Sequence, residues 1–278
     1  MRYRYSSILL LAAAISACGD EPGTTAPPSL PPPPPPPRTV LLKDIVIPNL
    51  PSPYYHFEYD TLGRIAAASF ASGLRMYDVI YGDDGRIMEM RNNVLVNHDR
   101  LVYAYDESLR VAAIRFVEST GRIVGALIFS YDGEKLTGIE RVRLFGSGFI
   151  TDKTMSLSYY PDGNLLELTE HHPSIDGQQT ETTTVDRFEQ YDDRINVDGF
   201  GLIHSEFFEH LVLLPGVQLQ RSNPGRQIHT GDGLNFRVDY RYTYDDTDRP
   251  LTKTGEATLL NGPDAGRRFE IGSVFSYY

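Results

Sequence analysis

The sequence predicts an all-β protein: an antiparallel meander of repeated β-hairpins that forms one large curled or barrel-like sheet, with one short helix near 202–214. Three observations lead to this prediction. A short unit of the form Tyr-Asp-x-x-Gly-Arg-aliphatic recurs along the chain, the segments between its copies alternate between apolar and polar residues, and a single stretch has helical spacing instead. Repetition and hydrophobic period are strong indicators of architecture in a single sequence.

The recurring unit begins with tyrosine and aspartate and ends with an aliphatic residue. Its clearest copies are Tyr59–Ile65, Tyr81–Ile87, Tyr105–Val111 and Tyr159–Leu165, and shorter or degenerate copies lie at Tyr131–Leu136, Tyr191–Ile195 and Tyr244–Leu251. Aspartate accepts hydrogen bonds from nearby backbone amides and glycine adopts positive φ without strain, so the pair favours a tight turn. Each copy therefore predicts one β-hairpin.

The segments between the units have a period of two. In the clearest example, Phe236, Val238, Tyr240, Tyr242 and Tyr244 fall on one face of a strand. The residues between them are asparagine, arginine, aspartate, arginine and threonine. This alternation is typical of an antiparallel sheet with one face on a core and the other in water.

The size of the sheet bears on its shape. About seven hairpins supply about fourteen strands, and a sheet of that size tends to curl or close on itself. The C-terminal segment Val274–Tyr278 resembles the last strand of outer-membrane barrels. A membrane-crossing barrel needs a lipid-facing apolar band about 25 Å tall, and the many charges on these strands disfavour it. Whether the sheet is open or closed stays undecided at this point.

One stretch departs from the hairpin pattern. The tyrosines of successive units lie 22 to 32 residues apart up to Tyr191, but the next one, Tyr244, follows after 53 residues. Within this interval Ile203, Phe207, Phe208, Leu211 and Leu214 have helical spacing, and Pro215-Gly216 ends the run. We expect a short amphipathic helix from about 202 to 214 that covers an end or edge of the sheet. The alternative is another hairpin.

The first residues form an export signal. Arg2 and Arg4 precede the uncharged apolar run Ile8–Ala14, which is too short to span a bilayer and reads as the central part of a signal peptide. Ile15-Ser16-Ala17-Cys18 then matches a bacterial lipobox, and Cys18 is the one cysteine of the chain. We expect cleavage before Cys18 and acylation of its thiol and new N-terminus, which together make a stable membrane anchor.

A proline-rich tether follows the expected anchor. Ten of the nineteen prolines lie between Glu21 and Arg38, and the run Pro31–Pro37 favours extended polyproline II. The expected organisation is a signal peptide over 1–17, the lipidated cysteine and tether over 18–38, and a single β domain over 39–278. Gly19-Asp20-Glu21 resembles the acidic signal that sends some Bacteroidetes lipoproteins to the cell surface, so we expect an outer-membrane, surface-displayed location.

Charge and cysteine content exclude some classes of partner. Loss of residues 1–17 removes two arginines and takes the formal net charge from −11 to −13, which disfavours nucleic acid as a partner. The same acidity leaves the lipid anchor on Cys18 as the expected contact with the membrane. Without a second cysteine, the fold depends on its own core rather than on disulfides.

The sequence predicts no catalytic, cofactor or metal site. His171-His172 would point to opposite faces of a strand, which suits joint metal binding poorly. Asp83-Asp84-Gly85 and the group Asp245, Asp246 and Asp248 lack the spacing of a calcium loop, and turn formation explains them. Nucleophile, zinc and phosphate-loop motifs are absent from the sequence, so an enzyme is disfavoured, although paired carboxylates for hydrolysis would leave no local mark.

The Tyr-Asp…Gly-Arg-aliphatic unit resembles the YD repeat of RHS-type proteins. The whole arrangement is similar to a family of uncharacterised lipoproteins from Bacteroidetes. The shared elements are the lipobox, the Tyr-Asp hairpins, the segment Tyr191–Asn196, the pair Ser222-Asn223 and a terminal aromatic strand, Phe269–Tyr278. In that family a proline often follows the asparagine, whereas this chain has Val197. The resemblance implies a meandering, porin-like β-sheet, open or closed, and implies no activity.

Three classes of function fit these expectations. The first is a surface-displayed binding or scaffold lipoprotein for a glycan, a peptide or an envelope protein. Exposed aromatics such as Tyr54 and Tyr55 would suit it as contact residues, and the alternative for these two is packing on the sheet edge. The second is an assembly component that faces the periplasm. The third is a tethered hydrolase with an unmarked site. A concave cluster of acids would favour the hydrolase, and an aromatic groove would favour the binding module.

Overall fold

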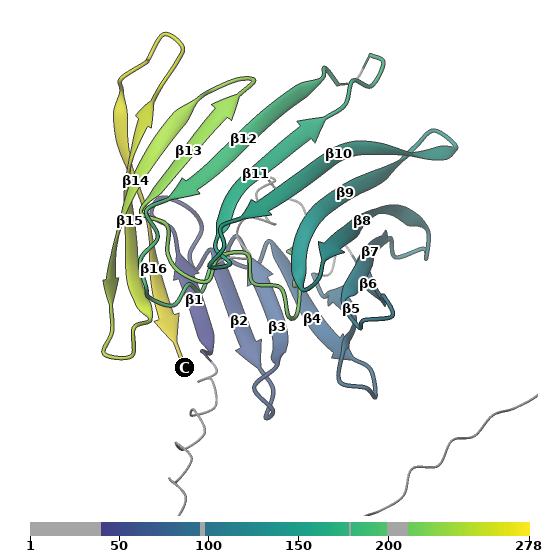
Figure 1. Ribbon diagram of the computed structural model, residues 1–278. Helices are drawn as coiled ribbons and strands as arrows, with labels where there is room; N and C mark the ends of the chain where they lie inside the picture. Colours follow the sequence, from purple (N-terminus) through teal and green to yellow (C-terminus); the bar gives the residue numbers. More distant parts are fainter. Residues whose placement is uncertain (1–39, 95–97, 178, 199–210) are drawn as a thin grey trace, which may run out of the picture. The chain divides into compact units, whose positions relative to one another are not determined.

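The chain forms a closed antiparallel β-barrel. The computed structural model describes residues 40–94, 98–177, 179–198 and 211–278, and these contain sixteen strands joined as a meander (Figure 1). The strands are β1 Leu42–Val46, β2 Tyr55–Tyr59, β3 Ile65–Phe70, β4 Arg75–Tyr81, β5 Ile87–Asn92, β6 Arg100–Tyr105, β7 Val111–Val117, β8 Ile123–Asp132, β9 Lys135–Phe145, β10 Gly148–Tyr159, β11 Leu165–His172, β12 Thr182–Glu189, β13 Arg226–Gly231, β14 Phe236–Tyr244, β15 Pro250–Leu259 and β16 Arg268–Tyr277. The predicted meander of hairpins is confirmed, and β1 pairs with β16 to close it.

The expected helix near 202–214 is not borne out. Residues 211–214 have no regular secondary structure, and 202–210 lie outside the described residues. Leu211 and Leu214 are apolar because they are buried in the barrel, and burial on all sides produces an apolar run without any helical period. Within the described ranges, we find no helix that is long and apolar enough to cross a bilayer.

The hairpin units all turn at one end of the barrel, which we call the tight-turn rim. It consists of the connections β2–β3, β4–β5, β6–β7, β8–β9, β10–β11 and β14–β15, at the lower end of Figure 1. Because consecutive strands run in opposite directions, the other hairpin connections lie at the far end. The start of β1 and the end of β16 also meet at the tight-turn rim, where Leu42 pairs with Tyr277.

Aspartate and arginine close three of these turns in the same way. Asp60 Oδ1 accepts hydrogen bonds from the backbone amides of Leu62 and Arg64, both at 2.9 Å. The Arg64 Nε–H donates to Asp60 Oδ2 at 2.8 Å. These hydrogen bonds, led by the one from the Arg64 amide, lower the pKa of Asp60. Asp106 with Arg110 and Asp245 with Arg249 repeat the arrangement.

Each unit is also fastened to its neighbour. The Tyr81 hydroxyl donates a hydrogen bond to the Ile65 carbonyl at 2.9 Å, one hairpin earlier. Equivalent bonds come from the hydroxyls of Tyr59, Tyr105, Tyr131, Tyr159, Tyr191 and Tyr277. The arginine of one turn lies over the tyrosine ring of the next in the pairs Arg64–Tyr81, Arg86–Tyr105 and Arg110–Tyr131. Cation–π contacts of this kind stabilise the rim beyond its backbone ladder.

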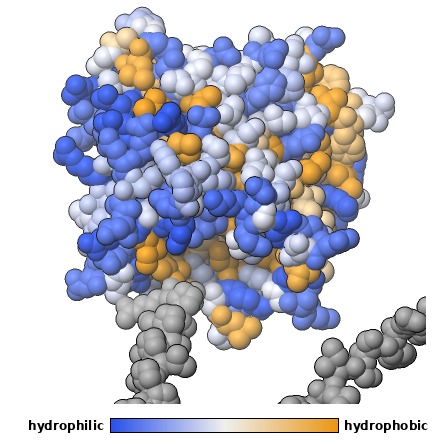
Figure 2. Space-filling view, in the orientation of Figure 1, coloured by the Kyte–Doolittle hydropathy of each residue, from blue (hydrophilic) through white to orange (hydrophobic). Residues whose placement is uncertain are grey.

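The apolar face of the sheet points inward. Most inward positions on paired strands are apolar or aromatic, as in the pairs Val79–Met90 and Ile114–Leu127, while the pair Asp78–Arg91 points outward. Exposed charged residues on outward positions include Glu58, Asp78, Arg91, Arg115, Arg187, Arg241, Glu256 and Glu270. Figure 2 shows a surface on which hydrophilic residues predominate, with hydrophobic patches between them. A barrel that faces lipid has the opposite arrangement.

The segment between β12 and β13 fills part of the interior. We call its described residues, 190–198 and 211–225, the core connection. Leu211, Val212 and Leu213 are buried among the inward side chains of the strands. The Tyr103 hydroxyl of β6 donates a hydrogen bond to the Leu213 carbonyl at 2.8 Å. Barrels of sixteen strands are wide enough to leave a water channel, and here a piece of the chain itself occupies that space.

Candidate functional site

A cavity of about 470 Å³ lies inside the barrel at the tight-turn rim, and we call it the rim cavity. Its walls are Val40, Leu42, Phe57, Tyr59, Gly63, Arg64, Ile65, Tyr81, Ile87, Ile195, Asn196, Val197, Leu213, Leu214 and Pro215. Most of these side chains are apolar or aromatic. Its volume falls within the roughly 300–1,000 Å³ that small-molecule sites occupy.

Strands β1 to β5 supply one wall of the rim cavity. Tyr59 is held there because its hydroxyl donates a hydrogen bond to the Leu42 carbonyl at 2.9 Å. Burial raises the pKa of Tyr59 to about 12, so its hydroxyl stays protonated at neutral pH. The charge of Arg64 is paired with Asp60 and its guanidinium lies against the Tyr81 ring. The wall therefore offers apolar and aromatic surface with little unpaired charge.

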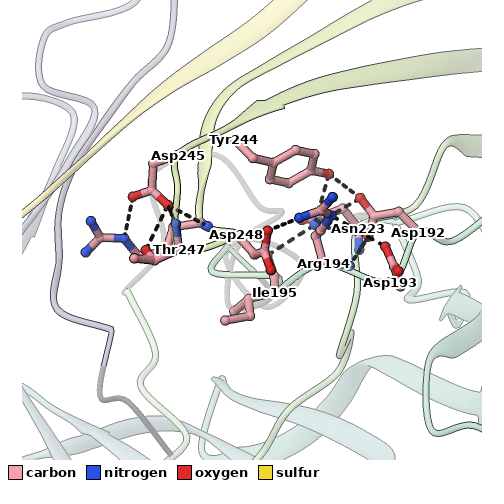
Figure 3. A network of polar contacts seen from close by, with 10 residues as sticks. Asp192, Asp193, Arg194, Ile195, Asn223, Tyr244, Asp245, Thr247 and Asp248 are labelled. Carbon is pink, nitrogen blue, oxygen red and sulfur yellow. Dashed lines mark hydrogen bonds and ion pairs between the residues drawn. The ribbon is translucent and has the colours of Figure 1, made fainter.

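The core connection supplies the other wall and is held by a polar network (Figure 3). Asn223 is only 2% exposed, and its side-chain amide donates to the Asp192 carboxylate, at 3.3 Å, and to the Ile195 carbonyl, at 3.1 Å. The Tyr244 hydroxyl of β14 donates to the same carboxylate. Arg194 pairs with Asp248 in the β14–β15 turn. The network joins the start and end of the core connection to one hairpin, and so it positions Ile195 beside the cavity.

A charged cluster lies inside the barrel, on β9, β10 and β11. Asp152 is 2% exposed and forms ion pairs with Arg141 at 2.8 Å and Arg143 at 2.6 Å. Lys153 is 4% exposed and pairs with Glu170 at 2.8 Å. A β-bulge at this point of β10 turns the adjacent residues Asp152 and Lys153 both inward. Because opposite charges meet at short distances, this cluster is an internal ion-pair network.

The predicted site residues have separate positions. Cys18 and the segments 1–17 and 18–38 lie outside the described residues. His171 faces outward and contacts Thr183, whereas His172 faces inward and contacts Glu170, so the two imidazoles point to opposite faces as predicted. Among the described residues, no group of three His, Cys, Asp or Glu side chains is placed to hold a metal ion.

The acidic turn residues and the adjacent Tyr54 and Tyr55 contribute to turns and to packing. The carboxylates of Asp84 and Asp245 accept hydrogen bonds from the backbone of their own turns. Tyr55 is 7% exposed and belongs to the core, and Tyr54 packs edge to face against it at 4.9 Å. Of the two alternatives for these tyrosines, exposure as contact residues does not hold for Tyr55, which packs inside the sheet. Tyr55 has the inward phase of β2, which it shares with Phe57.

Sequence reasoning did not identify the residues of the rim cavity. Leu42, Ile65 and Leu213 come from three distant parts of the chain, and each has the ordinary character of a core residue. The long interval between Tyr191 and Tyr244 was the available signal, because an insertion of that length in a regular meander needs somewhere to go.

Comparison with known proteins supports the fold. No family model matches the chain, and no curated protein matches it. A porin-like protein from Bacteroides vulgatus ATCC 8482 has a similar structure, with a TM-score of 0.56 and 12% identity over 86% of this chain and 99% of that one. One from Bacteroides uniformis ATCC 8492 gives a TM-score of 0.53 and 11% identity over 81% of this chain and 89% of that one. The chain thus has the porin-like barrel fold that the resemblance implied.

Proposed function

We propose that this protein is a lipoprotein of the bacterial outer membrane, anchored through Cys18 and displayed at the cell surface. Its barrel is then a binding module that holds a small, largely apolar ligand in the rim cavity. The inward direction of the apolar face carries the proposal. A barrel whose outer face carries many charges and whose apolar side chains face inward is suited to water rather than to the hydrocarbon of a bilayer.

Membrane attachment must then come from outside the barrel. The lipobox ending at Cys18 provides such an anchor, and two or more acyl chains bind a membrane stably. The acidic residues Asp20 and Glu21 next to the cysteine support display at the surface. The character of the rim cavity supports the ligand class, because apolar walls with few polar groups favour apolar molecules.

Binding can be tested on the soluble form that begins at Thr39. We expect the neutral fluorophore N-phenyl-1-naphthylamine to bind saturably and medium-chain fatty acids to displace it. Val197→Phe adds bulk to a wall residue of the cavity and should weaken binding more than about tenfold. Val217→Phe makes the same change elsewhere in the core connection and should leave binding unchanged. Equal affinities for the two variants, or no saturable binding, would refute the ligand part of the proposal.

Anchoring and location need a separate experiment in cells. The wild type should fractionate with membranes and carry a diacylglyceryl group on Cys18, and Cys18→Ala should lose both properties. Protease added to intact cells should digest the wild type if it faces the medium. Protection until the outer membrane is opened would instead place the protein on the periplasmic side and contradict surface display.

A further inference from the structure

Two adjoining cavities lie inside the barrel in addition to the rim cavity. The inner one, of about 240 Å³, is lined by Ile45, Ile47, Tyr55, Phe188, Asp198, Gln220, Pro224, Gln227, Tyr240, Lys253 and Ser273. The outer one, of about 590 Å³, lies under the β1–β2 connection and shares Ile47, Tyr240, Lys253 and Ser273 with it. None of these residues lines the rim cavity. We call the two together the polar cavity, because hydroxyl, amide and charged groups converge in it.

An ion pair lies at the centre of the polar cavity. Lys253 Nζ on β15 is 3.3 Å from Asp198 Oδ2 on the core connection, and each side chain is 21% exposed. Burial alone would lower the pKa of Lys253, but the Asp198 carboxylate and Tyr240 outweigh it, so the pKa lies above its ordinary value. The lysine is therefore charged at neutral pH, and the site as a whole has no net charge from this pair.

A chain of hydrogen bonds fixes the wall beside the ion pair. The Tyr240 hydroxyl donates to Gln227 Oε1 at 2.7 Å, and Gln227 Nε2 donates to Asp186 Oδ1 at 2.8 Å. His229 Nδ1 lies 2.9 Å from the same Asp186 oxygen. Each member orients the next one, so the polar groups of this wall are preorganised for binding.

A glycine makes room for the tyrosine in this wall. A Cβ at Gly255 would lie 2.7 Å from Val238 Cγ1 and 3.0 Å from Tyr240 Cδ1, which is closer than carbon atoms approach. The missing side chain leaves space for the Tyr240 ring beside Gly255. The Lys253 ammonium then reaches over that ring, 4.6 Å from its centre. Tyr240 and Lys253 line both the inner and the outer cavity.

We propose that the polar cavity binds a neutral polyhydroxylated molecule of the size and chemistry of a monosaccharide. Such a ligand both donates and accepts hydrogen bonds, and the cavity offers both kinds of partner. Lys253 has three N–H donors, and among the described residues only Asp198 accepts a hydrogen bond from it. Asp198 can accept further bonds through its carboxylate, and the Ser273 hydroxyl also faces the space. A charged ligand would have to compete with the internal ion pair and gain less.

The test is calorimetric titration of the form that begins at Thr39. The probes are glucose, N-acetylglucosamine and myo-inositol, with glucuronate and glucosamine as charged analogues. We expect at least one neutral probe to bind, and Asp198→Asn and Ser273→Ala each to weaken it several-fold. Asp239→Asn changes an aspartate on the outward face of β14 and should have no effect. Binding of N-phenyl-1-naphthylamine should persist at saturating sugar, since the two cavities are separate.

Three results would overturn the proposal: no binding of any neutral probe, tightest binding of a charged analogue, or wild-type affinity in Asp198→Asn. If Asp198→Asn does not fold, Ser273→Ala decides, because it removes only a hydroxyl. If the fluorophore binds and no sugar binds, only the proposed ligand of the polar cavity is refuted. If a sugar binds and the fluorophore does not, only the proposed ligand of the rim cavity is refuted.

Discussion

The guanidinium of Arg64 lies 4.1 Å from the centre of the Tyr81 ring, so the arginine of one hairpin covers the tyrosine of the next. The same arginine closes its own turn on Asp60. Tyr81 in turn donates its hydroxyl proton to the carbonyl of Ile65, the residue after the arginine. The recurrence of arginine and tyrosine in the unit follows from this geometry, because Arg64 and Tyr81 each contact two hairpins.

The tyrosine hydroxyls of the rim should contribute to stability. Tyr105→Phe leaves the Ile87 carbonyl without its donor, at 2.8 Å in the wild type, and should lower the free energy of unfolding by about 1 kcal/mol. Tyr54→Phe is the matched control, since Tyr54 packs on Tyr55 and its hydroxyl has no partner among the described residues. Urea denaturation measures both, and equal stabilities for the two variants would contradict the interlocking role.

Substitutions at two equivalent turn positions should change the stability of the barrel in opposite directions. Leu109 has φ 64° and is 62% exposed, at the place where another unit has Gly85 with φ 76°. A non-glycine residue in this region costs about 1–2 kcal/mol, and the greater freedom of glycine in the unfolded chain offsets part of that. Leu109→Gly should therefore stabilise the barrel slightly, whereas Gly85→Ala should destabilise it. Thermal unfolding of both variants checks the signs, and a destabilised Leu109→Gly would contradict them.

Alkaline pH should unfold the barrel. Burial raises the pKa values of Tyr59, Tyr131 and Tyr159 from 10.0 to about 12. Between pH 10 and 12 the unfolded chain releases these protons and the folded chain keeps them, so the free energy of unfolding must fall as pH rises. Below pH 10 this contribution is fully present. Urea midpoints at pH 8, 10 and 11 measure the effect, and a midpoint independent of pH would contradict it.

The buried ion pairs of β9 and β10 should matter more than those on the surface. Asp152→Ala leaves two arginines together inside the barrel and should cost about 3–5 kcal/mol. The matched control is Glu256→Ala, which removes an exposed pair with Arg268 and should cost under about 1 kcal/mol. Guanidinium denaturation compares the two. A similar loss in both variants would mean that burial of the Asp152 cluster has no energetic consequence.

Asn223 should hold the core connection in place. Asn223→Ala removes the donors to the Asp192 carboxylate and the Ile195 carbonyl, and should cost about 1–3 kcal/mol. Hydrogen exchange of the Asp192 amide, which donates to the Asn223 carbonyl, should become faster. Binding of the apolar fluorophore should also weaken, because Ile195 lines the rim cavity. Asn93→Ala removes an exposed amide that donates to Asp78 and should change neither property.

Local features of the sequence predicted the hairpins well. Aspartate and glycine determine a turn through contacts within a few residues, and the period of two in segments such as Phe236–Tyr244 is visible without knowledge of the partner strand. The expected helix failed because Leu211 and Leu214 owe their character to burial among distant strands. The repeated unit predicted about fourteen strands, and the described residues contain sixteen. Strands β1, β13 and β16 flank no copy of the unit, and the copy at Tyr191 is followed by the core connection instead of a second strand.

The sequence by itself determined that the chain is a meander of hairpins with one apolar and one polar face, because turns and alternation are local properties. The tertiary structure decided that the sheet closes and that its apolar face points inward, which depends on how β1 meets β16 and on where the core connection goes. It also decided which residues share a cavity. Lys253 and Asp198 are 55 residues apart in the chain and 3.3 Å apart in space, and a distance of that kind has no local signature.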